Sequence, residues 1–314
     1  MNPQTPRIKG MIKIQKDDMP IRPIVDYSQA PANQLAKKLN KILEIFLPLP
    51  NMFNVINSLQ IMNEMSDIPF TPDLQLASLD IADMYSNIPT DDIEHIIRPI
   101  CTYQDVSTDL MLEILAITKI FLPQNYYGFI ATNYIQPKGL AMCSSSSSVL
   151  SELYIQHMEH TKAIHTLTKP GTVAYFRYVE DNLLIYNKHL VDIENIHSTF
   201  NSFCPSLKFT LELEKDNKLN FLDLTLEKTN TCFSYNIYRK VTTIDTIIPM
   251  DWKHPLEQKM AAITYLLNRT NIYNLHPTHK QSEMDKIMHK LRNNMYNSSI
   301  IDILQRRKQL PYQA

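Results

Sequence analysis

The sequence predicts an α+β fold in which helices pack on an antiparallel sheet and a helical segment follows. Strand-like and helix-like segments succeed one another without the regular strand–helix–strand alternation of parallel sheets. Two apolar, aromatic runs at 173–178 and 183–186 also flank the adjacent acids Glu180 and Asp181, which is typical of a β-hairpin with a polar turn. The chain has 314 residues, 44% of them hydrophobic, so it can bury cores for two or three subdomains.

The N-terminal elements are expected to be a strand pair and two helices. Residues 8–27 predict the strand pair, with its turn at Asp17-Asp18. A helix follows from Pro31, which suits a first helical turn, and Pro48 ends it. Five apolar side chains recur there at helical spacing: Leu35, Leu39, Ile42, Leu43 and Phe46. A second, short helix is predicted near 51–65.

The central segment begins with a strand, Leu74 to Ile81, that carries an acid near its end, Asp80. Thr90 is expected to cap the next helix, and Ser107 to cap a helix that runs to about Phe121. The following elements are expected in this order: a hairpin through Gly128, a long helix at 147–165, the acid-tipped hairpin at 173–186 and a helix near 190–203.

In the C-terminal segment the sequence predicts three strands, followed by three helices. The strand-like runs are 207–212, 219–226 and 233–238, and the helices are expected near 255–270, 281–296 and 299–308. The segment 276–279, between the first two of these helices, is expected to be a loop.

Composition excludes several classes of protein. No apolar run approaches the roughly 20 residues of a membrane span, and the N-terminus has no apolar signal core. We therefore expect no membrane partner and an intracellular location, nuclear or cytoplasmic, rather than secretion. The four cysteines show neither zinc spacing nor a disulfide framework. Only four glycines occur, which excludes glycine-rich phosphate loops.

Charge is distributed unevenly although the net charge is only −1. Residues 78–238 carry 11 basic and 19 acidic residues, whereas residues 239–314 carry 12 basic and 6 acidic ones. An acidic centre suits a divalent metal ion, and a basic end suits a phosphate backbone. A chance fluctuation among solvated surface residues explains the same pattern.

The adjacent acids Glu180 and Asp181 repel each other at a hairpin tip unless a cation neutralises them. Phosphoryl transfer uses two Mg²⁺ ions about 4 Å apart, so carboxylates from different strands must converge. Asp80 near a strand end meets that demand together with the hairpin acids. Taken alone, Asp80 is better explained as a turn or helix cap.

Several segments occur in one order over roughly residues 8–270. They are Lys13-Ile14-Gln15-Lys16 with Arg22-Pro23-Ile24, then Ser78 to Pro89, Gln136 to Ser145, Arg177 to Asp181, and Phe221-Leu222-Asp223 with Tyr238-Arg239-Lys240. In this order they resemble the finger strands, the first catalytic motif, the template- and nucleotide-binding motif, the second catalytic motif and the stretch after the palm of the reverse transcriptases of Penelope-like retroelements, which are relatives of telomerase.

The resemblance implies a right-hand polymerase fold: a palm made of an antiparallel sheet with helices, plus partial fingers and a helical thumb. The partial fingers would comprise residues 1–77, the palm with the catalytic acids 78–228, and a primer-grip-like hairpin with the thumb 229–314. In the thumb, Arg306-Arg307-Lys308 would face the duplex, or would simply be a solvated helix end.

The implied activity is RNA-directed DNA polymerisation, a nucleotidyl transfer from dNTPs to a DNA primer on an RNA template, with Mg²⁺ or Mn²⁺ as cofactor. Asp80, Glu180 and Asp181 would be the catalytic acids and metal ligands, and Ile81 would lend a backbone carbonyl to the metal site.

The same resemblance assigns a nucleotide site. Lys13 and Arg22 would contact the triphosphate, and Tyr85 would lie under the sugar and exclude a 2′-hydroxyl. Gln136 and Gly139 belong to the motif that binds template and nucleotide, where Gly139 would permit a close approach. Without the motifs these residues read as surface cations, a core tyrosine and a turn glycine.

The chain departs from the family's pattern at the turn itself, where Glu180 stands in place of an aspartate. The extra methylene moves the carboxylate by about 1.5 Å, which puts turnover in doubt. Cys143 stands where glycine is usual. The upstream region of the family and its GIY-YIG endonuclease are not found, so we expect a fragment. Two alternatives follow: a catalytically impaired remnant that only binds nucleic acid, and a structural α+β protein whose acids are surface turns.

Overall fold

The structure is a computed structural model that describes residues 4–14, 18–47, 49, 51–141, 143–301 and 304. The chain forms two compact units. Unit 1 comprises residues 1–55 and 73–213, and unit 2 comprises residues 56–72 and 214–314. This division follows compactness, whereas the expected domains 1–77, 78–228 and 229–314 follow motifs and stay a prediction.

Unit 1 contains two four-stranded sheets, with strand orders β6-β7-β3-β8 and β2-β1-β4-β5. Its strands are β1 (Arg7–Ile12), β2 (Ile21–Asp26), β3 (Leu74–Ala82), β4 (Tyr126–Phe129), β5 (Thr132–Ile135), β6 (Thr172–Tyr178), β7 (Asp181–Asn187) and β8 (Lys208–Leu213). Every pair in the first sheet is antiparallel, and the second sheet contains one parallel contact, between β1 and β4. The mixed α and β composition with antiparallel sheets agrees with the fold class expected from the sequence.

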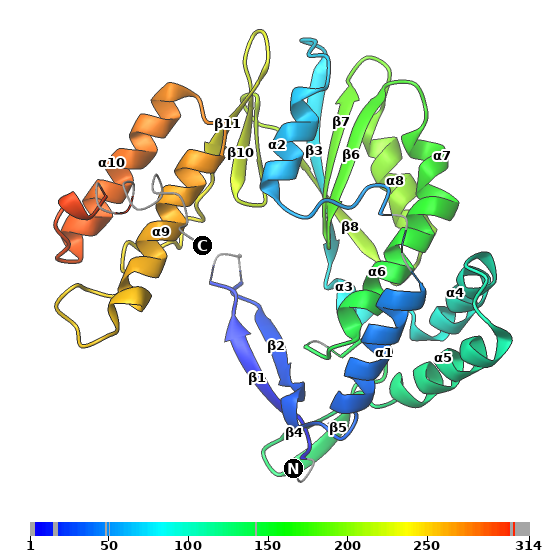
Figure 1. Ribbon diagram of the computed structural model, residues 1–314. Coiled ribbons are helices and arrows are strands. Elements are labelled where there is room, and N and C mark those ends of the chain that lie inside the picture. Colours follow the sequence, from blue (N-terminus) through cyan, green and yellow to red (C-terminus); the bar gives the residue numbers. More distant parts are fainter. Residues whose placement is uncertain are drawn as a thin grey trace. The chain divides into compact units, whose positions relative to one another are not determined.

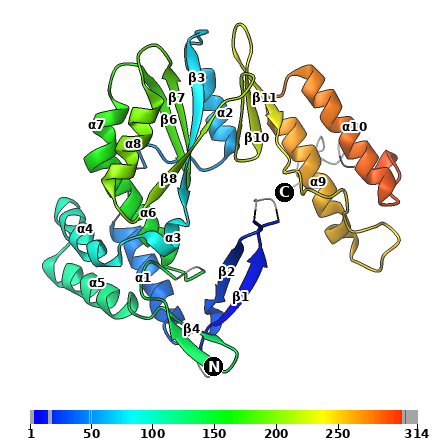
Figure 2. The ribbon, with the colours of Figure 1, turned by 180° about the vertical axis from the view of Figure 1, so that it is seen from behind.

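The helices of unit 1 lie in two groups. They are η1 (Tyr27–Gln29), α1 (Asn33–Phe46), α3 (Met84–Asn87), α4 (Thr90–Tyr103), α5 (Thr108–Phe121), α6 (Ser147–Met158), the π-helix η2 (Glu159–Ala163), α7 (Ile164–Leu167) and α8 (Ile193–Phe203). Figures 1 and 2 show α6, α7 and α8 beside the β6-β7-β3-β8 sheet, and α1, α4 and α5 together at the end of α6.

The core of unit 1 follows from the apolar strands. The run Leu183 to Tyr186 of β7 is buried, because β7 pairs with a neighbour on each side and is covered on both faces. Leu184 and Tyr186 of this run share one hydrophobic cluster with Leu79 of β3 and Phe200 of α8. Burial of these side chains fixes the strand register, since a slip of one residue would exchange the two faces of a strand.

Most predicted elements of unit 1 are confirmed, including the hairpin at 173–186. The side chain of Ser107 caps α5 by accepting a hydrogen bond from the backbone N–H of Leu110. Two details are wrong. Thr90 is the first helical residue of α4 and makes no cap, because Pro89 holds the capping position. The long helix at 147–165 is interrupted by the π-turn of η2.

Unit 2 is built from two distant segments of the chain. Its elements are α2 (Ser58–Ser66), β9 (Lys218–Phe221), β10 (Leu224–Lys228), β11 (Phe233–Ile237), α9 (Leu256–Ile272) and α10 (Pro277–Asn293). The sheet order is β11-β10-β9, and α2 packs on β11. The ring of Phe70 meets the ring of Phe233 edge-on at 5.3 Å, and the hydroxyl of Tyr235 donates to the carbonyl of Met62. These contacts join residues 56–72 to the C-terminal segment.

The helices α9 and α10 form a small core of their own, made by Ile263, Leu267, Ile287, Leu291, Tyr296 and Ile301. Two sequence predictions are wrong here. The run 219–226 is two strands rather than one, because the chain turns at Leu222, whose φ is +53°. The segment 276–279 opens α10 rather than forming a loop, since Pro277 suits the first helical turn and the His276 side chain caps it. The expected helix at 299–308 and the cluster Arg306-Arg307-Lys308 lie largely outside the described residues.

Candidate active site

The three predicted acids meet at one end of the β6-β7-β3-β8 sheet. Tyr178 pairs with Asp181 across a two-residue turn, so Glu180 lies in the turn and Asp181 begins β7. Asp181 in turn is the register partner of Asp80 on β3. Residues directly opposite each other in antiparallel strands have Cα atoms about 4.5–5.5 Å apart. The backbone N–H of Ile81 donates to the carbonyl of Glu180 at 3.1 Å, which ties β3 to the turn itself.

The turn adopts an unfavourable backbone conformation. Val179 has φ +55°, in the left-handed region that β-branched residues rarely adopt. Such a conformation destabilises the folded state by about 1–3 kcal/mol, and it persists only where the surrounding contacts hold the backbone in place. Strain of this kind at a turn that carries two acids is an observation that favours a functional site.

A cavity of about 560 Å³ opens beside the acids. Six of the predicted site residues line it: Lys13, Arg22, Asp80, Ile81, Tyr85 and Glu180. Lys13 directly follows β1 and Arg22 lies in β2, while the others come from β3, α3 and the β6–β7 turn. The cavity therefore brings cations and carboxylates together from segments that are more than 150 residues apart in the sequence. Its size lies in the range of small-molecule sites.

Lys13 has an ionic partner that sequence reasoning missed. Its ammonium lies 3.6 Å from the carboxylate of Asp83, and the Lys13 side chain is only 16% exposed. Asp83 stands at the start of α3 with φ +46° and also lines the cavity. A ligand phosphate at Lys13 would compete with this carboxylate.

Tyr85 is half-buried on α3, and its ring packs against the core of unit 1. Burial raises the pKa of its hydroxyl, the negative charge of Glu180 raises it further, and a hydrogen bond with Ser151 only partly opposes both. The phenol therefore stays protonated at neutral pH, so the side chain that lines the cavity is uncharged.

Gln136 and Gly139 are not among the residues that line the cavity. The side-chain amide of Gln136 donates to the carbonyls of Lys138 and Leu140, so it shapes its own loop. Gly139 has φ +74°, and a Cβ there would come within 2.3 Å of the backbone of Ser86 on α3. The close approach that requires glycine is thus to the chain itself.

Two further residues complete that loop. The side-chain amide of Asn125 donates to the carbonyl of Gly139 at 2.8 Å, a buried contact for which the sequence offers no signal. Cys143, which replaces a usual glycine, has φ +70°, a conformation that favours glycine. The loop that carries the predicted nucleotide motif therefore contains two left-handed residues, of which Gly139 packs close to α3.

The oxygen atoms at this end of the sheet are of the kind that Mg²⁺ binds, and the backbone brings the residues that carry them together. Carboxylate and carbonyl oxygens are the ligands that Mg²⁺ prefers, and Asp80, Ile81, Glu180 and Asp181 supply them at one end of the sheet. Within the described ranges, no three histidine, cysteine or acidic side chains are gathered closely enough to hold a metal ion. An ion would therefore have to draw these carboxylates together by side-chain rotation.

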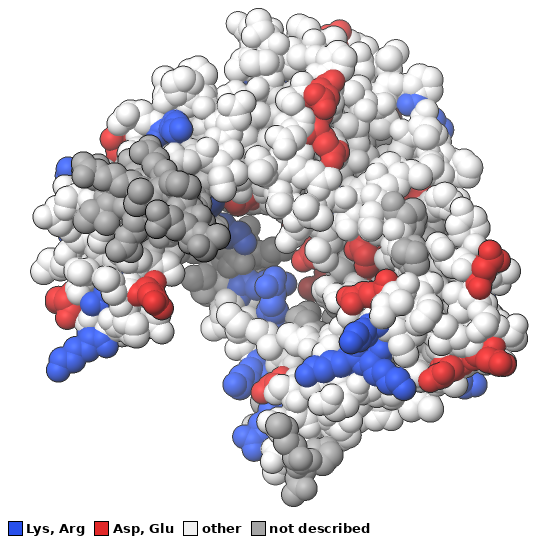
Figure 3. Space-filling model, viewed as in Figure 1, with Lys and Arg blue, Asp and Glu red and all other residues white. Residues whose placement is uncertain are grey.

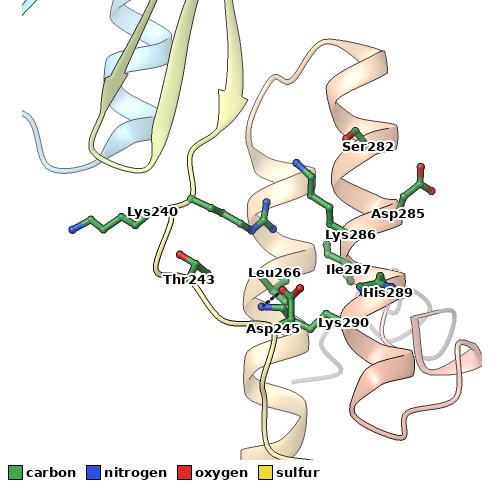
Figure 4. A pocket seen from close by; sticks show the side chains of 11 residues that line it. Lys240, Thr243, Asp245, Leu266, Ser282, Asp285, Lys286, Ile287, His289 and Lys290 are labelled. Atoms are coloured by element: carbon green, nitrogen blue, oxygen red, sulfur yellow. Dashed lines mark ion pairs between the residues drawn. The ribbon is translucent and has the colours of Figure 1, made fainter. Parts of the chain in front are cut away.

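Basic residues gather at two other places. In unit 1, blue side chains cover α1 in Figure 3, where Lys37, Lys38 and Lys41 are exposed. In unit 2, a cavity of about 440 Å³ is bordered by cations of the β11–α9 connection and α10 (Figure 4). Most of these cations are paired within the unit: Arg239 bonds the buried Glu283, and Lys290 lies 3.3 Å from Asp245. Lys240 points away from the helices.

Solved structures with a similar fold include nucleic-acid polymerases. A telomerase from Candida albicans, solved in complex with the TWJ fragment of telomeric RNA, matches with a TM-score of 0.61 and 11% identity, over 92% of this chain and 55% of that one. The RNA-dependent RNA polymerase of a human picobirnavirus matches with a TM-score of 0.57 and 12% identity, over 97% and 60%. The Sicinivirus 3Dpol RNA-dependent RNA polymerase matches with a TM-score of 0.57 and 13% identity, over 98% and 68%.

These similarities show that the chain has a polymerase fold of the palm type, at low sequence identity. The chain spans about half the length of the telomerase that it matches. A family profile described as "Animal helix-turn-helix domain" matches residues 246–306, which include α9 and α10. No curated protein sequence matches the chain. In the part that the structure describes, no helix is long and apolar enough to cross a membrane.

Proposed function

We propose that the protein is an RNA-directed DNA polymerase that transfers nucleotides from dNTPs to the 3′-hydroxyl of a DNA primer on an RNA template. The observation that carries the proposal is the cavity in which Lys13, Arg22 and Tyr85 face the acids Asp80 and Glu180. The polymerase fold supports the same conclusion. The palm, fingers and thumb, and a retroelement origin of the Penelope-like type, belong to this proposal and rest on the motif resemblance, as does an intracellular location.

The cations of the cavity bind the triphosphate. Lys13 and Arg22 supply positive charge where phosphate oxygens would lie, and Arg22 offers a planar fork of donors. Lys13 gives up its contact with Asp83 when a phosphate arrives. Because the Asp83 carboxylate is exposed, the pair is worth about 1 kcal/mol, so the exchange costs little.

Tyr85 selects the sugar. Its ring is held by core packing and lines the cavity five residues beyond Asp80. A fixed aromatic ring at the sugar leaves no room for a 2′-hydroxyl, which is the group that distinguishes ribonucleotides from deoxyribonucleotides. Deoxynucleotides are therefore the proposed substrates, although the picobirnavirus and Sicinivirus neighbours are RNA-dependent RNA polymerases.

The acids orient the reacting groups. Bound at Asp80, Glu180, Asp181 and the carbonyl of Ile81, two Mg²⁺ ions would supply the charge that activates the primer hydroxyl and stabilises the leaving pyrophosphate. Asp80 and Asp181 are held opposite each other by the strand register. Glu180 reaches farther into the cavity than an aspartate would, because of its additional methylene. Mn²⁺, which tolerates more varied geometry, is expected to support the reaction as well.

Primer extension tests the proposal. Purified protein is mixed with poly(rA)/oligo(dT), Mg²⁺ or Mn²⁺, and either dTTP or UTP. We expect extension with dTTP only, and a loss of at least about 100-fold in Asp80→Asn. The control Asp105→Asn changes an exposed acid whose left-handed backbone suits asparagine, and it should keep full activity. Extension that survives in Asp80→Asn would refute the assigned chemistry.

A second candidate function is nucleic-acid binding without catalysis. The helix-turn-helix match and the four-residue connection between α9 and α10 favour it, since two helices joined by a short turn form a common nucleic-acid-binding element. RNA binding that weakens steeply with salt, that is unchanged in Asp80→Asn and that occurs without extension in either metal would favour this candidate.

A further inference from the structure

We propose that Arg177 is a positioning residue for the acids of the β6–β7 turn: its buried guanidinium holds the turn through the carbonyl of Val179. The inference deepens the proposed polymerase function and rests on it, because the orientation of Glu180 and Asp181 matters for metal binding. Arg177 precedes Glu180 by three residues; it opens the segment that resembles the second catalytic motif, but it had no role of its own there.

Both carbonyls of the two-residue turn accept hydrogen bonds. The carbonyl of Val179 accepts from the Arg177 side chain at 3.3 Å. The carbonyl of Glu180 accepts from the backbone N–H of Ile81 at 3.1 Å and from the side-chain amide of Asn182 at 3.2 Å. The left-handed Val179 is thus fixed on one side by Arg177 and on the other by β3 and β7.

The guanidinium of Arg177 uses all five of its N–H groups. Its Nε and one Nη2 hydrogen bind Glu159 at 2.7 and 3.1 Å, and Glu152 accepts from Nη1 at 2.9 Å and from Nη2 at 2.5 Å. The fifth N–H is the one that reaches Val179. The Arg177 side chain has no exposed surface. It therefore has no donor left for a ligand, and its contact outside the carboxylates is with the turn.

The two carboxylates come from one helix face. Glu152 and Glu159 are seven residues apart, so they lie on the same side of the α6–η2 helix. The π-helix begins at Glu159, and π-turns are frequent at functional sites. Tyr175 extends the network, since its hydroxyl contacts both Glu159 and Asn182. The helix behind the sheet is thereby connected to both supports of the turn.

The backbone of Arg177 is also fixed. Its N–H donates to the carbonyl of Phe53, and its carbonyl accepts from the N–H of Val55, each at 2.8 Å. The outer edge of β6 is covered there by residues 53–55. These backbone hydrogen bonds fix the main chain from which the Arg177 side chain extends. A side chain that positions the turn must itself be held in this way.

Burial by itself would lower the pKa of Arg177, but the hydrogen bonds and charges of Glu152 and Glu159 outweigh it and raise the pKa. The guanidinium therefore stays charged under all assay conditions. A lysine keeps the charge but has three donors on a single nitrogen, so it cannot bind two carboxylates bidentately and reach the turn as well. Arg177→Lys separates the geometric role from a purely electrostatic one.

The test compares wild type, Arg177→Lys and a control at a temperature where circular dichroism shows each to be folded. Three quantities are measured: Mn²⁺ affinity by calorimetry, hydrogen exchange in the peptide that contains 178–182, and the kcat and KM of primer extension. The control is Lys228→Met, which breaks a buried ion pair with Glu214 in unit 2. It should lower stability without changing Mn²⁺ affinity or exchange at the turn.

For Arg177→Lys we expect faster exchange at the turn, Mn²⁺ affinity about tenfold weaker, and kcat reduced by about 10–100-fold with an unchanged KM for template–primer. Wild-type exchange together with wild-type Mn²⁺ affinity in the folded variant would overturn the proposal. Should Arg177→Lys fail to fold, Glu152→Gln weakens the same clamp, and the same readouts decide.

The two proposals fail in different ways. A wild type that neither binds Mn²⁺ nor extends primers would refute the polymerase function. Exchange at the turn in Arg177→Lys still decides the role of Arg177 in that case, because it does not depend on activity.

Discussion

Glu180 is the residue at which a small change should increase the rate of primer extension. The Glu180→Asp substitution shortens the side chain by one methylene and withdraws the carboxylate by about 1.5 Å, toward the position that the motif usually provides. We expect primer extension to rise, by up to about 100-fold, because misplacement of about 1 Å can cost that much. The measurement is kcat at saturating dTTP with Mg²⁺. A decrease would show that the site has adapted to glutamate.

Gly139 is the residue at which an added methyl group should be most harmful. A Cβ there would meet the Ser86 backbone at 2.3 Å, and φ is +74°. Gly139→Ala should therefore lower the free energy of unfolding by about 1–3 kcal/mol, measured by urea denaturation. The matched control is Gly128→Ala, whose Cβ would find its neighbours at 3.4 Å. Equal losses in the two variants would mean that the packing against α3 is unimportant.

Single residues were predictable where a motif or a cap determines them, and less so where burial does. The acids, Lys13, Arg22 and Tyr85 were selected from their order in the sequence. The structure brings them to one cavity or one sheet end, whereas their roles stay a prediction. Asp83 and Asn125 were missed because short polar side chains of their kind are common and carry no spacing signal. Arg177 was recognised as part of a motif, but its buried contacts were missed because arginine is ordinarily exposed. The seven-residue spacing of Glu152 and Glu159 was the only available sign.

At the scale of elements, Asp223 joins three parts of unit 2. It lies in the turn between β9 and β10, and its carboxylate contacts the hydroxyls of Ser58 on α2 and Tyr273 after α9, as well as the guanidinium of Arg269. The hydrogen bond with Tyr273 measures 2.8 Å and the contact with Arg269 2.9 Å. Burial, with the help of Asp223, raises the pKa of Tyr273 to about 12, so its hydroxyl remains a donor.

Asp223→Asn should destabilise unit 2 by about 1–3 kcal/mol, because the amide keeps the shape but loses the charge that Arg269 and both hydroxyls bind. Hydrogen exchange should rise in α2 and α9 together. The control Asp251→Asn changes an exposed acid of the same unit and should leave exchange unaltered. A rise confined to the β9–β10 turn would contradict the joining role.

Elements were predicted well where apolar periodicity is undisturbed and poorly where backbone geometry intervenes. The hairpin at 173–186 has two apolar runs around polar residues, and it was located correctly. The run 219–226 looks like one continuous strand, yet the chain turns at Leu222, which has a positive φ. An apolar residue such as leucine is not a turn signal, so the sequence did not predict this turn. The π-turn at Glu159 could not be predicted from apolar periodicity either, because the residues on both sides of it have the pattern of an ordinary α-helix.

At the scale of the whole molecule, buried tyrosines make stability sensitive to alkali. Burial raises the pKa of Tyr27 in unit 1 and of Tyr235 in unit 2 to about 12, from the usual 10. The folded state therefore retains protons that the unfolded chain loses. This contribution is fully present below pH 10 and is lost as the pH rises toward 12.

Urea denaturation at pH 9, 10 and 11 should show this loss. Because one pKa unit corresponds to about 1.4 kcal/mol, the shift of about two units makes each tyrosine contribute on the order of 3 kcal/mol. In Tyr27→Phe the decline for unit 1 should be shallower, although the hydrogen bond to the carbonyl of Gln124 is also removed. Tyr103→Phe, at a tyrosine that is 85% exposed, serves as the control. A decline of the same steepness in Tyr27→Phe would exclude this tyrosine as the cause.

The discontinuous make-up of unit 2 has a consequence for synthesis on the ribosome. The 141 residues 73–213 separate α2 from the strands and helices that complete its unit. At about 5–20 residues per second, translation of that stretch takes roughly 7–28 s. During this interval the nascent chain carries Ile61, Met62 and Met65, all buried in the finished unit, without their partners. Chaperone demand should therefore peak before the C-terminal third emerges from the exit tunnel.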